Sequence, residues 1–245
     1  MLRAILAVLL AFIALPAQGG EVSVAVAANF TEPAKAIAAA FEKKTGHKAV
    51  MSFGPSGAFY AQIQQGAPFE VFLSADAERP TRLEAEGFGV AKTRFVYAYG
   101  ALVLWSAKPG FIDAKGQVLK TGTFDHIAIA DPAAAPYGTA AIETMKKLAV
   151  HDALGPKIVK GASIAQAYTF VHTGAAELGF VALSQVKNRP GGSRWIVPKS
   201  FYSPIDQQAI LLKPGANDPA ARAYLDFLKT PQARAIITTY GYEVK

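Results

Sequence analysis

The stretch that decides the fold is residues 22–76, which read VSVAVAANFTEPAKAIAAAFEKKTGHKAVMSFGPSGAFYAQIQQGAPFEVFLSAD. Residues 22–27 are an apolar run of strand length, and residues 33–44 then place apolar side chains at helical spacing. A second strand is predicted over 49–53, a short helix over 57–65 and a third strand over 70–74. This repeated alternation predicts an α/β protein with mainly parallel sheets flanked by helices.

The alternation continues along the chain. Further strands are predicted over 126–130 and 178–183, and further helices over 139–149 and 164–173, with two more after Pro219 and from Pro231. Two long extended stretches, 96–106 and 206–213, interrupt this pattern. We interpret them as two crossings between lobes, so that lobe one comprises residues 20–98 and 206–245, and lobe two comprises residues 99–205.

Composition excludes several classes of protein. The chain has 245 residues, of which 51% are hydrophobic and 18% charged, which excludes a disordered protein. It has no cysteine, so disulfides, thiolate metal sites, cysteine nucleophiles and an N-terminal lipid anchor are excluded. The 25 basic residues exceed the 18 acidic ones, but they are spread along the chain. We therefore expect no nucleic-acid partner, while a positive field favours the approach of small anions.

The first 19 residues have the pattern of an export signal. A short positive head ending at Arg3 precedes an apolar run over 4–15, and Pro16 breaks that run before the small residues Ala17 and Gly19. Such a run is too short to be a stable membrane anchor, and no later apolar stretch reaches the length of about 18 residues that a span needs. We expect removal of residues 1–19 and a soluble protein in the periplasm or an equivalent space.

Four strand-to-helix junctions share one design. They lie at residues 27–33, 53–58, 131–139 and 161–164. Each directs free backbone N–H groups at the positive end of a helix, often with a hydroxyl or amide beside them, which is a ready anion site. Ordinary helix capping is the alternative at any single junction. Because the four divide two and two between the lobes, an interlobe cleft would bring all of them to one point.

The sequence supports a catalytic function less well than anion binding. Ser184 to Lys187 matches a Ser-x-x-Lys motif, but both Lys-Thr-Gly triplets precede it and no Ser-Asp-Asn follows. The turn around Ser56 lacks the Gly-x-Ser-x-Gly spacing of a nucleophile elbow, and no His-x-x-x-His pair or other metal-ligand spacing occurs. An exported serine hydrolase using Ser56 or Ser184 is therefore the rival class of function.

Seven segments carry a resemblance to a known family: 29–32, 52–58, 62–68, 71–76, 131–138, 178–181 and 240–242. Through them the chain resembles the periplasmic molybdate-binding proteins of ABC importers, over essentially its whole length after the signal, and most specifically over 52–76. The resemblance implies a two-lobed periplasmic binding protein with two crossing strands as hinge. It implies an oxyanion ligand, molybdate or tungstate, delivered to a membrane permease, with no enzyme activity and no cofactor. A receptor for sulfate or another oxyanion is the alternative, and we expect a monomer.

The family holds its ligand with neutral hydrogen-bond donors from strand–helix turns. Carried over to this sequence, these are Asn29 and Ser56 in lobe one and Tyr137 and Ile164 in lobe two, Ile164 through its backbone N–H, with Ala28 adding a main-chain donor. They are contacts to the molybdate oxyanion, not to a bare metal cation.

The sequence departs from the commoner family pattern at three places. Many members have Ser where Asn29 stands and a small residue where Tyr137 stands. Some members have a Tyr donor where this chain has Ala182, which has no donor side chain. We expect Tyr137 and Asn29 to compensate for that missing donor.

Overall fold

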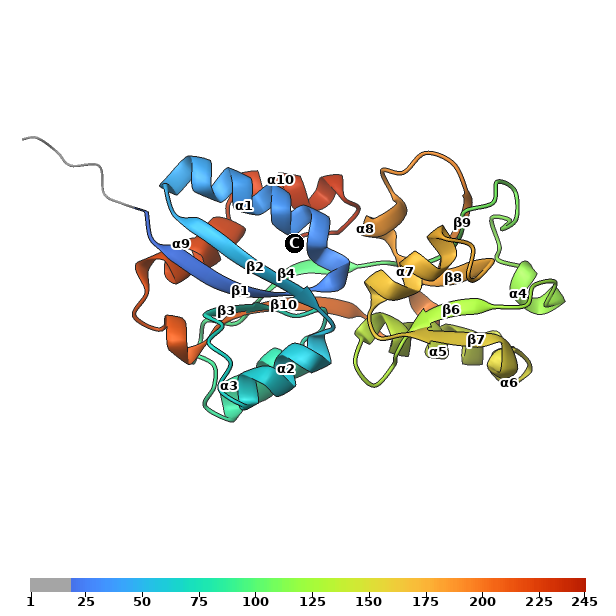
Figure 1. The fold of residues 1–245 in the computed structure, drawn as a ribbon, viewed down its shortest axis with the longest axis horizontal. Coiled ribbons are helices and arrows are strands. Elements are labelled where there is room, and N and C mark those ends of the chain that lie inside the picture. The colour runs from blue at the N-terminus through green and yellow to red at the C-terminus, as the bar shows by residue number, and fades with distance from the viewer. Residues whose placement is uncertain (1–18) are drawn as a thin grey trace, which may run out of the picture.

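A computed structural model describes residues 19–245 as two lobes side by side, each built around its own five-stranded sheet (Figure 1). The predicted export signal, apart from its last residue, lies outside the described residues. Between residues 19 and 245, no helix has both the length and the apolar character that crossing a bilayer requires.

The first sheet has the order β2-β1-β3-β10-β4. Strand β1 pairs in parallel with β2 and β3, whereas β10 is antiparallel to both of its neighbours, so four of the five strands point the same way. The strands are β1 (Glu21–Ala27), β2 (Lys48–Gly54), β3 (Val71–Leu73), β4 (Phe95–Gly100) and β10 (Ile205–Leu211).

The second sheet repeats this plan in the order β7-β6-β8-β5-β9. Here β6 pairs in parallel with β7 and β8, and β5 alone runs against its neighbours. The strands are β5 (Leu102–Ser106), β6 (Ile127–Ala130), β7 (Ile158–Gly161), β8 (Leu178–Ala182) and β9 (Ser193–Ile196). The α/β prediction with mainly parallel sheets is thus confirmed, although β7 and β9 were not predicted, because each has only four residues and carries a basic side chain.

The chain passes between the sheets twice. It crosses once between β4 and β5, around Ala101, and once between β9 and β10. The stretch 96–106, expected to be one extended segment, is therefore two strands in two different sheets. The predicted boundaries between the two lobes, 98/99 and 205/206, remain a prediction.

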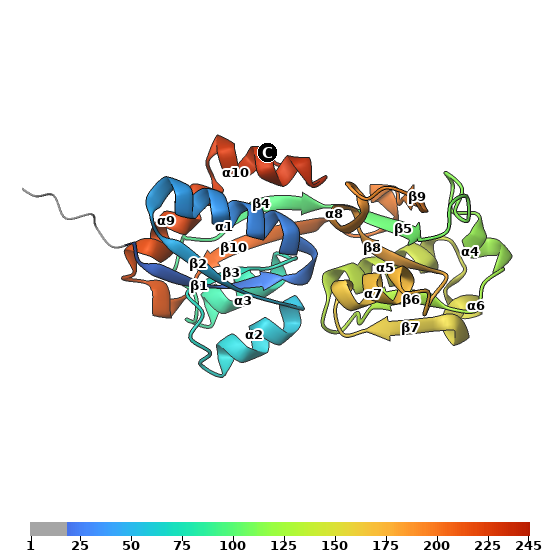
Figure 2. The same ribbon diagram turned by 45° about the horizontal axis from the view of Figure 1, so that its top comes forward.

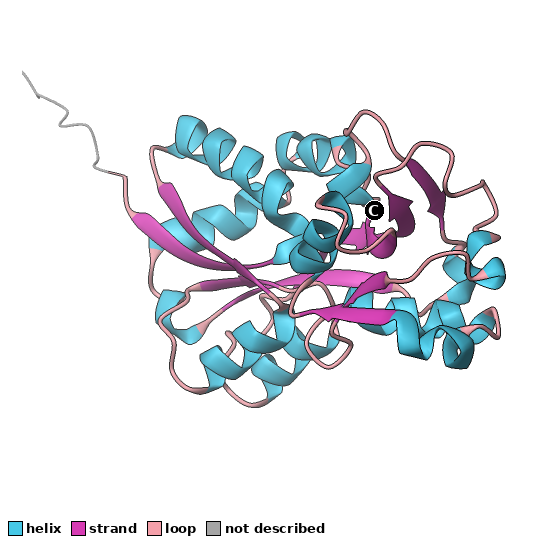
Figure 3. Cartoon of the chain, turned by 45° about the vertical axis from the view of Figure 1, so that its right-hand side comes forward, coloured by secondary structure: helices cyan, strands magenta, loops and turns pink. Residues whose placement is uncertain are grey.

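Helices cover both faces of the first sheet (Figures 1 and 3). One face packs under α1, α9 and α10 around a core that includes Phe41 and Tyr224, and the other packs under α2 and α3 around Phe72. The helical elements of this lobe are η1 (Ala28–Phe30), α1 (Thr31–Thr45), α2 (Ser56–Gln64), α3 (Glu78–Ala85), η4 (Lys213–Gly215), α9 (Pro219–Leu228) and α10 (Pro231–Thr239).

The second lobe has a single core, which also takes in Ala27, Ala28 and Ala75 from the first lobe, so the lobes are packed against each other. The helical elements of the second lobe are α4 (Val118–Thr121), α5 (Pro136–Lys147), α6 (His151–Leu154), η2 (Gly155–Lys157), α7 (Ile164–His172), α8 (Leu183–Val186) and η3 (Lys199–Phe201). The C-terminal segment follows α10 (Figure 2) and returns to β4 through a bridge between Glu243 and Tyr99.

Candidate functional site

The amino ends of three helices from both lobes come together where the lobes touch. The N–H of Gly57, in the first turn of α2, donates to the carbonyl of Ala134 in the loop before α5, with an N···O distance of 2.9 Å. Ala28 of the first lobe and Ala165, in the first turn of α7, line one cavity, so the start of α7 lies against the first lobe. Helices α2 and α5 begin without a side-chain cap. The first N–H groups of a helix have no partner within that helix, so this junction offers further donors beside the Gly57 N–H, which Ala134 binds.

Ser56 does not cap α2, although the helix predicted over 57–65 would place it at the cap position. It is the first residue of α2, after Pro55 at the cap position, and it is buried. Its Oγ instead accepts a hydrogen bond of 3.0 Å from the backbone N–H of Ala75 in the β3–α3 loop. Because that contact uses an acceptor position of the hydroxyl, the hydroxyl proton stays available for another partner.

Tyr137, the second residue of α5, is only 1% exposed. Its phenolic oxygen lies 3.4 Å from Nε2 of Gln207, which donates to it. Burial raises the pKa of Tyr137 well above its ordinary value, and the neighbouring phenol of Tyr242 raises it further. The Tyr137 side chain is therefore a neutral hydroxyl throughout the physiological pH range.

Asn29 and Ala28 lie in η1, directly after β1, and both are buried. The Asn29 amide Nδ2 donates to Oε1 of Gln207 at 2.8 Å and to the hydroxyl of Tyr242 at 2.9 Å. An amide nitrogen has two hydrogens, so both are engaged within the protein. The structure thus joins the Asn29 side chain to β10 and to the C-terminal segment after α10.

Ile164 is the first residue of α7 and is buried at the lobe boundary. Its carbonyl accepts from Nε2 of Gln185 at 3.1 Å, and Oε1 of the same Gln185 accepts from the N–H of Ala182 at 2.9 Å. Gln185 therefore braces the start of α7 against the end of β8, while Ala182 itself offers only its backbone.

A buried polar network under these residues was not predicted from the sequence. Gln207 and Tyr242 contact Asn29, and the hydroxyl of Tyr97 donates to Oε1 of Gln207 at 3.0 Å. Burial raises the pKa of Tyr242 to about 12 and raises that of Tyr97 well above its ordinary value. The signal that could have identified Gln207 is its position inside an otherwise apolar extended segment, since a buried amide must find partners.

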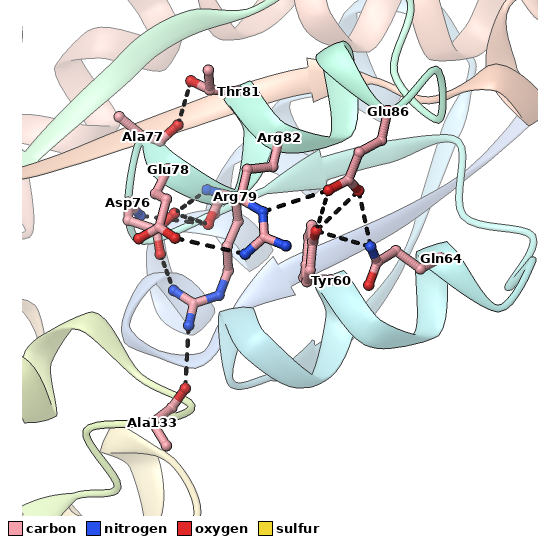
Figure 4. A network of polar contacts seen from close by, with 11 residues as sticks. Tyr60, Gln64, Asp76, Ala77, Glu78, Arg79, Thr81, Arg82, Glu86 and Ala133 are labelled. Atoms are coloured by element: carbon pink, nitrogen blue, oxygen red, sulfur yellow. Dashed lines mark hydrogen bonds and ion pairs between the residues drawn. The ribbon is translucent and has the colours of Figure 1, made fainter.

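Two cavities flank this junction. One of about 240 Å³ lies between the start of α1 and helices α7 and α8, and its lining includes Asn29, Glu32, Tyr168 and Arg189. The other, of about 410 Å³, lies between the start of α3 and the β6–α5 loop. Arg79 lines this second cavity and is paired with Asp76, and Figure 4 shows its guanidinium reaching the Ala133 carbonyl across the lobe boundary, at 3.3 Å.

The contacts of Ser184 do not resemble those of a catalytic serine. Its hydroxyl donates to the carbonyl of Asn29 at 2.8 Å and lies 3.0 Å from the hydroxyl of Tyr242. A serine nucleophile needs a base within hydrogen-bond reach. Within residues 19–245, the hydrogen bonds of Ser184 and Ser56 involve no histidine, lysine or carboxylate. The Ser184 hydroxyl instead ties α8 of one lobe to η1 of the other.

Comparison with known proteins gives a consistent result. The family model described as bacterial extracellular solute-binding protein matches residues 22–243. The chain is 62% identical to the molybdate-binding protein ModA of Rhodobacter capsulatus, covering 94% of this chain and 91% of that one. It is 56% identical to the molybdate-binding protein ModA of Azotobacter vinelandii, covering 98% and 96%.

The fold is similarly matched by a solved structure, the periplasmic molybdate-binding protein of Azotobacter vinelandii. The two superpose with a TM-score of 0.89 at 43% identity, over 91% of this chain and 99% of that one. Family match, sequence identity and fold therefore agree over nearly the whole described chain, and the chain belongs to the bacterial extracellular solute-binding proteins.

Proposed function

We propose that this protein captures molybdate, and also tungstate, between its lobes and delivers the anion to the permease of an ABC importer. The observation that carries the proposal is the meeting of helix starts from both lobes, α2 with the loop before α5 and η1 with α7, in a chain 62% identical to a molybdate-binding protein. As a solute-binding protein the chain is not an enzyme, and the serine hydrolase alternative is set aside.

The proposed contacts come from both lobes. Ser56 contributes its hydroxyl, Tyr137 its phenol, and Ala28, Asn29 and Ile164 their backbone N–H groups. Assigning Asn29 through its backbone follows from its side chain, whose two amide hydrogens are already bound by Gln207 and Tyr242. Tyr137 replaces the side-chain donor that Ala182 lacks.

Neutral donors suit a dianion in a closed cleft. Moving the anion out of water removes its hydration, and fixed hydrogen bonds with helix dipoles replace that hydration without a buried cation. A hydrogen bond to a charged group contributes roughly 1.5–3 kcal/mol, so five to seven of them support sub-micromolar affinity after association costs.

Selectivity follows from size. Molybdate and tungstate are nearly equal in radius, and both are larger than sulfate. A ring of donors held at the spacing of the larger ion would be stretched around sulfate, so sulfate would form longer and weaker hydrogen bonds. This geometric argument favours molybdate and tungstate over the sulfate alternative.

We further propose how the protein works in the cell. Residues 1–19 direct export and are then removed, which places the mature chain in the periplasm as a monomer. The lobes, residues 20–98 with 206–245 and residues 99–205, close around the anion, and the closed form is the state that the permease recognises.

A ligand panel tests the proposal. Mature protein is titrated with molybdate, tungstate, sulfate and phosphate by calorimetry and by thermal unfolding. At 100 times its dissociation constant, a ligand adds about 2.7 kcal/mol to the free energy of unfolding. We expect that gain with molybdate and tungstate, and far less with sulfate at equal concentration. Equal stabilisation by sulfate would contradict a size-selective site.

A further inference from the structure

Gln207 on β10 is a completely buried polar side chain with partners in both lobes. Its Oε1 accepts from Nδ2 of Asn29 at 2.8 Å, and its Nε2 donates to the phenol of Tyr137 at 3.4 Å. Asn29 belongs to the first lobe and Tyr137 to the second. One amide therefore contacts a proposed ligand residue on each side of the cleft.

The local backbone explains how Gln207 reaches this position. The pairing of β10 with β4 shifts register between Gln207 and Gln208, and Tyr97 is the extra residue on β4 at this irregularity. Bulges redirect side chains next to functional sites. Here the Tyr97 hydroxyl shares its hydrogen between the same Oε1, at 3.0 Å, and the Ser74 carbonyl, at 3.2 Å. Two donors, Asn29 and Tyr97, therefore face the Gln207 oxygen, which favours one orientation of the amide.

Gly100, at the end of β4, leaves room for this contact. A Cβ at Gly100 would lie 2.3 Å from the phenolic oxygen of Tyr137 and 2.9 Å from Nε2 of Gln207. Neither atom could keep its place beside a larger residue. The meeting of the amide and the phenol is thus built into the strand that joins the lobes.

We propose that Gln207 is a positioning residue for anion binding, which rests on the function proposed above. By donating to the Tyr137 oxygen, the amide occupies an acceptor position of the phenol and directs its proton away from Gln207. By accepting from Asn29, it fixes the turn whose backbone faces the cleft. The phenolic hydrogen then has two acceptors to choose from, the bound anion and the nearby hydroxyl of Tyr242, which itself accepts from Asn29. The charged anion is the stronger acceptor, so the Tyr137 hydroxyl donates its hydrogen bond to the anion.

The test measures tungstate affinity by calorimetry for Gln207→Met, Tyr137→Phe and the double variant. Methionine keeps the length of the side chain and removes both polar atoms. We expect each single variant to weaken binding by about five- to thirty-fold, the loss of roughly one hydrogen bond to a charged group. The tungstate affinity of the double variant should lie within about two-fold of that of the weaker single variant. Without Gln207 the phenol of Tyr137 is no longer oriented toward the anion, so removing it as well costs little more.

Gln208→Met is the matched control. Gln208 is the next residue of the same strand, is also buried, and accepts from Arg94 away from the cleft at 2.8 Å. This variant should lose stability and keep tungstate affinity within about two-fold. An affinity loss equal to that of Gln207→Met would make the effect one of general destabilisation and overturn the proposal.

The remaining outcomes separate this inference from the proposed function. Wild-type protein that does not bind tungstate refutes the function. Tight wild-type binding with unchanged affinity in Gln207→Met, or with fully multiplicative losses in the double variant, refutes only the role of Gln207.

If Gln207→Met fails to fold, Gly100→Ala provides a second test, because its methyl group displaces the phenolic oxygen of Tyr137 and Nε2 of Gln207. That variant should weaken tungstate binding at least five-fold, and unchanged affinity overturns the proposal.

Discussion

The hydroxyl of Ser56 accepts a hydrogen bond of 3.0 Å from the backbone N–H of Ala75, so a residue at the start of α2 is tied to the loop before α3. Both residues are buried at the lobe boundary. The bond fixes the position of the oxygen and leaves its proton free. Ser56 therefore has a contact that positions it and a donor that is uncommitted, which is the arrangement that anion binding needs.

Replacing Ser56 with Ala should reduce molybdate affinity by about ten- to a hundred-fold, because one hydrogen bond to the anion is lost. It should also lower the free energy of unfolding by about 1–3 kcal/mol, because the N–H of Ala75 loses its partner. Calorimetry measures the first quantity and urea unfolding the second. Thr230→Ala is the control, since Thr230 caps α10 through Ala233 and should affect stability alone. Unchanged affinity in Ser56→Ala would remove Ser56 from the site.

Gly57→Ala should change stability and affinity in opposite directions. Alanine within α2 stabilises the helix by about 0.5–1 kcal/mol. A Cβ there, however, would lie 3.1 Å from both Cα and the carbonyl oxygen of Ala134 in the other lobe, which disfavours closure. We expect molybdate affinity to fall by about three- to ten-fold, as the closed state becomes less populated.

Gly155→Ala is a suitable comparison for Gly57→Ala, because a Cβ at Gly155 would meet nothing within 4 Å. This variant should bind molybdate as the wild type does. If Gly57→Ala also binds as the wild type does, the contact with Ala134 does not limit closure.

Tyr137→Phe keeps the ring and removes the phenolic donor. We predict a loss of about 1–2 kcal/mol in molybdate affinity, five- to thirty-fold, expressed mainly as faster release in stopped-flow measurements. If only the backbone N–H of Tyr137 contacts the anion, the variant will bind as tightly as the wild type. That outcome would remove the argument that Tyr137 compensates for Ala182 and leave the rest of the site in place.

The buried phenol of Tyr242 should make the stability of the protein depend on pH in the alkaline range. Burial raises the pKa of Tyr242 from 10.0 to about 12, so the folded protein holds this proton more tightly than the unfolded chain does. The contribution of this proton to the free energy of unfolding is fully present below pH 10. It is lost as the pH rises toward 12, and the free energy of unfolding then falls by up to about 1.4 kcal/mol per pH unit. Urea unfolding of the wild type and of Tyr242→Phe between pH 8 and 11.5 measures it. The decline should be shallower in the variant, and equal slopes would contradict the buried, neutral phenol.

The sequence predicted the junctions that contain the proposed donors, because the starts of helices follow from local patterns. The resemblance to the family then assigned Ser56, Tyr137 and Ile164 as donors at these junctions, and the structure places each at the first or second residue of a helix. The hydrogen bond of Ser56 to Ala75 was not predictable in this way, since residues near a helix start normally cap it.

The network below the site could not be predicted because it joins distant parts of the chain. Asn29 contacts Gln207, 178 residues away in sequence, and Tyr242, 213 residues away. No periodicity encodes such pairs, which depend on the order of strands in the sheet and on the register shift between β4 and β10. A buried amide in an apolar strand indicates that partners exist and does not identify them.

The central claim is that the anion lies between the lobes, held by neutral donors. Anomalous diffraction from crystals of the tungstate complex locates the tungsten atom independently of any assumed site. We predict one strong peak between the amino ends of α2, α5 and α7, with the anion oxygens within hydrogen-bond distance of Ser56 Oγ and the N–H of Ile164, and with no lysine or arginine nitrogen in contact. A peak beside a guanidinium, such as that of Arg189 or Arg79, with none between the helix ends, would contradict the account.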